Sequence, residues 1–202
     1  MSSDEEDVDV GGAAAGAAPA KGTSKTLGLR IQKKLMGMGV KSKEAAKHFI
    51  DDESGAFLDV FYELVLKYTG DVKKSKKVLK DTIKIAVKVG LLYRHNQYSA
   101  AELTVGNNFR SKLKMSILTM ISYHDVAFTF DAEFLIGVLE ECQMLLKKQI
   151  SAHLTAKSLG RVDNVFSTLS NEGMLTALFT EEGYKEILEQ MNTSLNQLLE
   201  KI

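Results

Sequence analysis

Proline, tryptophan and cysteine are almost missing from this sequence. Proline occurs once, at Pro19, tryptophan does not occur, and Cys142 is the only cysteine. A single cysteine excludes an internal disulfide, and its place on an apolar helical face predicts a buried, unreactive thiol. Because proline interrupts helices, its scarcity beside long stretches with a 3.6-residue apolar period predicts an all-helical fold.

Long hydrophobic runs are absent as well. No uncharged run approaches the roughly 18 residues that a membrane-spanning helix requires. The N-terminus is acidic and has no leucine-rich core, so it is unlike a secretory signal. We therefore expect a cytoplasmic protein that can contact a membrane only from its surface.

Basic residues are missing from the first 20 positions. That segment holds five acids, which are Asp4, Glu5, Glu6, Asp7 and Asp9. Residues 21–50 then hold eight Lys or Arg against Glu44 alone. Although the formal net charge of the chain is zero, removing the first 20 residues leaves 26 basic against 21 acidic residues. The acids and the following GGAAAGAAPA predict a disordered tail over residues 1–22.

Apolar residues at helical spacing predict the order of the helices. A short amphipathic helix is expected first, with Leu27, Ile31, Leu35 and Met38 beside Arg30, Lys33 and Lys34. Longer helices are expected over about 42–68, 71–93, 99–124 and 131–152. Shorter helices follow over roughly 160–170 and 172–179, and a last one runs from Tyr184 to Leu199.

Polar residues at the predicted boundaries indicate how several helices begin. Asp71 and Asp131 are expected to be N-caps, and Ser99-Ala-Ala-Glu102 matches a capping box. The acidic run at 51–53, with Gly55, is expected to kink the first long helix. DVAFTF, residues 125–130, is expected to be a short extended connector.

A row of lysines follows the predicted 71–93 helix. At about 100° per residue these lysines fall within an arc of roughly 80°. They are Lys73, Lys77, Lys80, Lys84 and Lys88. The remaining face is apolar almost throughout, so we interpret the row, taken alone, as a solvated stripe on a surface helix.

Two arginines are harder to assign to solvent. On the predicted 99–124 helix, Arg110 is close in angle to Leu103 and Ile117, within the apolar arc. A buried guanidinium is costly unless it has an internal carboxylate, a route to water or an anionic ligand. Arg94 lies where the preceding helix ends, so the two can converge at one end of a helical hairpin. The residues alone leave a structural ion pair and an anion site equally open.

Catalytic and metal chemistry have little support in this sequence. The four histidines, His48, His95, His124 and His153, are far apart and show no i, i+4 metal spacing. His124-Asp125 has no accompanying G-x-S-x-G, and neither a Walker A loop nor G-x-G-x-x-G occurs. We expect no enzyme activity, no metal and no cofactor. The basic stripe lacks interleaved aromatics, so nucleic-acid binding is not expected.

Several ordered blocks resemble the tumor necrosis factor alpha-induced protein 8 family. They are LGLRIQKKL, AAKHFIDD, IKIAVKVGLLYRHNQYSAAEL, NFRSKL, SYHDVAFTFD and HLTAKSLGRVDNVF. The resemblance covers about residues 23–202 and implies a single all-helical domain over that range. It implies an antiparallel bundle of about six helices around a central apolar cavity that holds lipid.

The resemblance also implies a function and site residues. Members bind phosphoinositides, some transfer them, and they modulate lipid signalling, apoptosis and immunity. The family's headgroup residues match Lys33, Lys34, Arg94 and Arg110. The resemblance places the protein at anionic membranes, on the inner face of the plasma membrane.

Two further expectations concern the residues that line the cavity and an alternative function. The expected cavity-lining residues are Leu113, Ile117, Leu135 and Leu139. An alternative function from a different class is a lipid-independent helical adaptor that recruits apoptotic or small-GTPase signalling proteins.

Overall fold

The computed structural model describes residues 50–126 and 129–201. Within these ranges the chain forms seven α-helices and one 3-10 helix, and it contains no strand. The helices are α3 (Asp52–Thr69), α4 (Val72–Arg94), α5 (Ala100–Asp125), α6 (Ala132–Ile150), α7 (Ala156–Leu169), α8 (Glu172–Thr180), η2 (Glu182–Tyr184) and α9 (Lys185–Leu199). The predicted all-helical fold is confirmed. The expected tail, the expected amphipathic helix with Lys33 and Lys34, and part of the expected connector lie outside the described residues.

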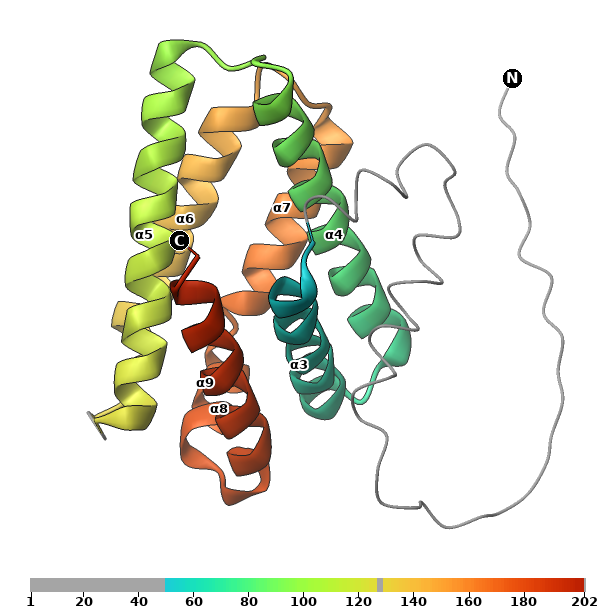
Figure 1. Cartoon of the computed structure of the whole chain (residues 1–202). Coiled ribbons are helices and arrows are strands. Elements are labelled where there is room, and N and C mark those ends of the chain that lie inside the picture. Colours follow the sequence, from blue (N-terminus) through green and yellow to red (C-terminus); the bar gives the residue numbers. More distant parts are fainter. Residues whose placement is uncertain (1–49, 127–128, 202) are drawn as a thin grey trace, which may run out of the picture.

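The six longer helices pack in a closed order (Figure 1). α3 contacts α4, α4 contacts α7, α7 contacts α6, α6 contacts α5, α5 contacts α9, and α9 returns to α3. The short helix α8 packs against α3, α6 and α9. Within residues 50–126 and 129–201, no helix is long and apolar enough to cross a membrane.

The start of α3 corrects the predicted helix over 42–68. Asp51 has an extended backbone, and its Oδ1 accepts a hydrogen bond from the Ser54 amide at 2.9 Å. This N-cap ends the helix on its N-terminal side, so the acidic run marks a helix start and not a kink. Lys201 near the C-terminus binds Asp51 at 2.7 Å and Glu53 at 2.5 Å. The two ends of the described chain are thereby joined.

The other predicted caps are confirmed. Asp71 accepts from the amides of Lys73 and Lys74, and Asp131 accepts from the amide of Phe134. The capping box of Ser99 and Glu102 is formed in both directions.

The predicted helix over 160–170 begins earlier in the structure, at Ala156. Thr155 has the extended backbone of an N-cap, although its side chain makes no capping bond. Gly160, which the sequence pattern places at the very start of the helix, lies well within α7. The apolar pattern alone therefore missed the first turn of this helix.

The core consists of four clusters of buried side chains. The largest joins α3, α5, α8 and α9 with Val78 of α4 and Tyr184 of η2, and a second joins α4, α6 and α7. Leu113 and Leu169 are only half-buried and pack against both of these clusters. Cys142 belongs to the second cluster and is fully buried, and burial raises the pKa of its thiol to about 11. The predicted burial of this cysteine is confirmed.

Asp59 on α3 is a carboxylate in an unfavourable setting. Its Oδ1 is buried and has no hydrogen-bond partner among the described residues. Burial, and then the charge of Glu63, raise the pKa of Asp59 from 3.8 to about 6. The folded state therefore holds the Asp59 proton more tightly than the unfolded chain does. As a result, the free energy of unfolding falls as pH rises from about 4 to about 6.

We expect Asp59→Asn to stabilise the protein at neutral pH. A shift of about two pKa units corresponds to about 3 kcal/mol, and solvent screening of this half-buried group reduces it to about 1 kcal/mol. Urea unfolding at pH 7.5 should show this gain. At pH 4 the gain should vanish, because Asp59 is then protonated in the folded wild type. An equal gain at both pH values would contradict the account.

Candidate functional site

The turn between α4 and α5 fixes the position of Arg94. After this last residue of α4, the His95 amide donates to Leu91 O and the Gln97 amide to Leu92 O, each at 3.0 Å. Asn96 has a φ of 50°, in the left-handed region that asparagine tolerates better than most residues. The backbone after Arg94 is thus well defined, while its side chain is exposed.

Aromatic and polar side chains beneath this turn connect it to the α6–α7 loop. The rings of Tyr93 and Tyr98 meet edge to face at 4.9 Å, and Tyr98 meets His153 at 5.2 Å. His153 Nε2 lies 3.0 Å from Glu102 Oε1, and Gln149 donates to Tyr93 Oη at 3.2 Å. These contacts link α4, α5, α6 and the α6–α7 loop beneath Arg94.

Tyr98 carries an unusual buried hydroxyl. Within the described part of the chain its Oη has no hydrogen-bond partner. Burial, followed by the nearby Tyr93 and Glu102, raises the pKa of Tyr98 to about 12. Tyr98 is therefore neutral at physiological pH and contributes packing under the turn, with no charge.

A glycine allows α5 to lie close to Tyr93 and Gln149. Gly106 is buried, and a Cβ atom at this position would meet Gln149 Nε2 and Tyr93 Oη. A larger residue would push apart the two groups that hold α4 and α6 together here.

Arg110 is exposed, which corrects its predicted place on the apolar face of α5. Arg110 lies outside the core because α5 has no single buried stripe. Only Gly106, Ser116, Ile117 and Ile121 are buried along its 26 residues. Leu103, whose angle placed Arg110 in the arc, is itself 39% exposed. The helix changes neighbours along its length, so one wheel does not describe it.

The two arginines lie on consecutive helices, Arg94 on α4 and Arg110 on α5. Arg110 is ten residues beyond the first residue of α5, about 15 Å along the axis. Neither guanidinium pairs with a carboxylate of residues 50–126 or 129–201. The structural ion pair that the sequence left open is therefore not found in the described part of the chain.

The four predicted cavity residues lie in or beside the packed core. Ile117 belongs to the largest cluster, Leu135 and Leu139 pack with Leu175, and half-buried Leu113 joins two clusters. Their role in lining a lipid cavity stays a prediction.

A groove that the sequence did not predict lies on the outer surface between α5 and α6. Two adjacent hollows of about 530 and 540 Å³ share Ser111 at their border. Their walls include apolar side chains with large exposed fractions, which are Met115, Leu118, Phe134 and Met144. We call this feature the α5–α6 groove.

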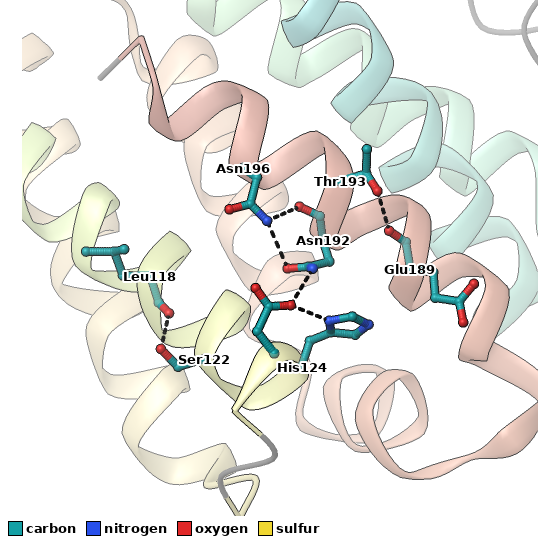
Figure 2. A network of polar contacts seen from close by, with 8 residues as sticks. Leu118, Ser122, His124, Glu189, Asn192, Thr193 and Asn196 are labelled. Atoms are coloured by element: carbon teal, nitrogen blue, oxygen red, sulfur yellow. Dashed lines mark hydrogen bonds and ion pairs between the residues drawn. The ribbon is translucent and has the colours of Figure 1, made fainter.

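His124 and Asp125 at the end of α5 belong to a hydrogen-bond network that reaches α9. Asp125 Oδ1 lies 2.7 Å from His124 Nδ1 and accepts from Asn192 Nδ2 of α9 at 2.7 Å (Figure 2). The nearby hydroxyls of Ser122 and Thr193 donate to carbonyls of their own helices. The hydrogen bond from His124 is the main cause that lowers the pKa of Asp125, and the one from Asn192 adds to it. The network links the C-terminal end of α5 to α9.

Together these features define a class of protein, a closed bundle of helices with two exposed arginines on consecutive helices. The family model described as tumor necrosis factor alpha-induced protein 8-like matches residues 22–202, and the chain belongs to this family. It is 38% identical to tumor necrosis factor alpha-induced protein 8-like protein 3 of Xenopus laevis over 202 residues, covering 100% of this chain and 98% of that one. It is 40% identical to tumor necrosis factor, alpha-induced protein 8-like protein 2 A of Danio rerio over 180 residues, covering 89% and 96%.

A solved structure shares the fold. The C-terminal region of G-protein interacting protein 1 from Dictyostelium discoideum aligns with a TM-score of 0.57 at 15% identity. The alignment covers 77% of this chain and 95% of that one.

Proposed function

We propose that this protein is a non-enzymatic phosphoinositide-binding protein. The observation that carries the proposal is the pair of exposed arginines on consecutive helices, Arg94 at the end of α4 and Arg110 on α5. Guanidinium groups form bidentate hydrogen bonds with phosphate oxygens, and neither arginine has a carboxylate partner among the described residues. A phosphorylated inositol ring offers several such phosphates within a small volume.

The arrangement of the core supports a place for the acyl chains. The buried side chains fall into four clusters and not one, and half-buried Leu113 and Leu169 lie at their junctions. We propose that acyl chains enter between these clusters, inside the ring of six helices. Each buried methylene group contributes about 0.8 kcal/mol, so two acyl chains would stabilise the complex strongly.

Membrane docking completes the proposal. Lys33 and Lys34 lie outside the described residues, and we propose that they contact anionic lipid at the inner face of the plasma membrane. Each cation near such a surface contributes about 1 kcal/mol, and salt weakens the attraction. From family membership we propose that lipid binding, with or without transfer between membranes, modulates lipid second-messenger signalling and thereby apoptosis and immune regulation.

The proposal is tested with vesicles matched for charge. One set contains phosphatidylcholine with phosphatidylinositol 4,5-bisphosphate, and the other replaces the phosphoinositide by enough phosphatidylserine to equal its charge. In cosedimentation, the full chain should bind the first set about tenfold or more tightly, since phosphatidylserine lacks the phosphomonoesters. Equal binding would show attraction to charge alone and would reject the proposed site.

The α5–α6 groove favours a second candidate function. Met144 is 63% exposed and Phe134 44% exposed, and such apolar groups on a surface often mark protein-binding sites. An adaptor that recruits apoptotic or small-GTPase signalling proteins would use this groove and would need no lipid. In that case, replacing Phe134 and Met144 by serine would abolish recruitment while leaving vesicle binding unchanged.

A further inference from the structure

A group of cations from two helices lies outside the site of Arg94 and Arg110. α4 contributes Lys80, Lys84 and Lys88, and α7, which packs on α4, contributes Lys157 and Arg161. We call these five residues the α4–α7 basic cluster.

Specific contacts hold two members of the cluster, Lys88 and Arg161, in place. Lys88 Nζ donates to Ser158 Oγ on α7 at 2.6 Å. Arg161 Nε lies 3.3 Å from Asp81 Oδ1, and Asn164 donates to the other oxygen of this carboxylate at 3.0 Å. Asp81 is buried, with 10% of its side chain exposed, so it lies beneath the cations.

The cluster has far more positive than negative charge. Asp81 is the one carboxylate that pairs with any of its members within residues 50–126 and 129–201. The other acid on this stretch of α7, Asp163, binds Lys147 of α6 at 2.7 Å and is thereby engaged elsewhere. Burial, and then the charges of Lys80 and Arg161, lower the pKa of Lys84, while burial and Arg161 lower the pKa of Lys88. Folding therefore brings these cations together against their mutual repulsion.

We propose that Lys84, Lys88, Lys157 and Arg161 bind a compact anion that carries several phosphate groups. A carboxylate ligand would supply one negative charge against this excess, whereas each phosphomonoester supplies nearly two. Arg161 uses Nε for Asp81, which leaves its terminal nitrogens to donate to phosphate oxygens. The site is independent of Arg94 and Arg110.

The lysine row on α4, which the sequence predicted to be one solvated stripe, therefore has two parts. Lys73 and Lys77 are exposed at the start of the helix, as a solvated stripe requires. Lys84 is exposed too, but it and the half-buried Lys88 have the charge of Arg161 on α7 nearby. The two parts of one row on the helix therefore have different roles.

Calorimetric titration of the full chain with inorganic tripolyphosphate tests the proposal. Lys84→Ala/Lys88→Ala should weaken binding about tenfold or more, because two charged contacts are lost. The matched control is Lys74→Ala/Lys76→Ala, two exposed lysines on α4 that are absent from the surroundings of Lys84 and Lys88. It should change the affinity less than about twofold, since distant exposed charges are screened. No binding by the wild type, or equal losses in both variants, would overturn the proposal.

Two further measurements distinguish an anion site from a purely structural cluster and from a membrane-binding surface. Lys84→Ala, which removes a charge but breaks no hydrogen bond of the described residues, should keep or exceed the wild-type melting temperature, because it relieves repulsion; a purely structural role would lower it. Arg94→Ala/Arg110→Ala should still bind tripolyphosphate, and a parallel loss would overturn the independence of the two sites. Binding of phosphatidylserine vesicles through the cluster, without binding of tripolyphosphate, would overturn the small-anion site in favour of a membrane surface.

Discussion

Replacing both Arg94 and Arg110 by alanine should remove the preference for phosphoinositide over charge-matched phosphatidylserine vesicles. Both side chains are exposed, so the loss should be about 10- to 100-fold in affinity, as expected for two charged hydrogen-bonding groups. Residual attraction to acidic lipid should remain, because the other cations of the chain are unchanged. The melting temperature should change little, since exposed charges contribute little to folding.

A matched control removes two other exposed cations, both lysines. Lys74→Ala/Lys76→Ala lowers the net charge equally, from exposed positions near the start of α4. It should weaken binding to both kinds of vesicle in parallel and leave their ratio unchanged. If the arginine variant also keeps the ratio of affinities for the two kinds of vesicle, then Arg94 and Arg110 do not recognise the phosphoinositide headgroup.

The largest effect on stability is expected from Asp81→Asn. This change keeps the shape of the side chain but removes the single negative charge that pairs with the α4–α7 basic cluster, leaving Arg161 with 16% exposure and no counter-ion. Breaking a buried ion pair in this way costs about 3 kcal/mol. For a chain of this size, that corresponds to a fall in melting temperature of roughly 6–12 °C.

Asp163→Asn is the control for this prediction. Asp163 also lies on α7 and pairs with a lysine at 2.7 Å, but both side chains are more than one-third exposed. Exposed pairs contribute at most about 1 kcal/mol, so the control should shift the melting temperature by only a few degrees. Equal shifts in the two variants would show that Asp81 is no more important than a surface acid.

Local chemistry in the sequence predicted most helix boundaries. Asp71, Asp131 and the box of Ser99 and Glu102 start helices through contacts with residues two or three positions away, so the signal is visible in sequence alone. The same chemistry at Asp51 was interpreted wrongly, because apolar periodicity before it suggested a continuing helix. Caps should therefore take precedence over periodicity when the two conflict.

Features that depend on pairing between distant helices were not predicted. Arg161 lies 80 positions after Asp81, and no local pattern indicates that α7 packs on α4. The contacts beneath Arg94 likewise join Tyr98 to His153 of the α6–α7 loop, 55 positions further along the chain. Arg110 was misplaced for a related reason, because the neighbours of α5 change along its length and only tertiary structure shows this.

Native mass spectrometry of the purified full chain tests the lipid-binding account most directly. The account predicts a population heavier than the bare chain by the mass of one phospholipid, which organic extraction releases and fragmentation identifies. Protein stripped of lipid should take up one equivalent of a short-chain phosphoinositide, and it should prefer this lipid to phosphatidylcholine of the same chain length. A chain that carries no lipid after gentle purification, and takes up neither lipid on incubation, would contradict the account.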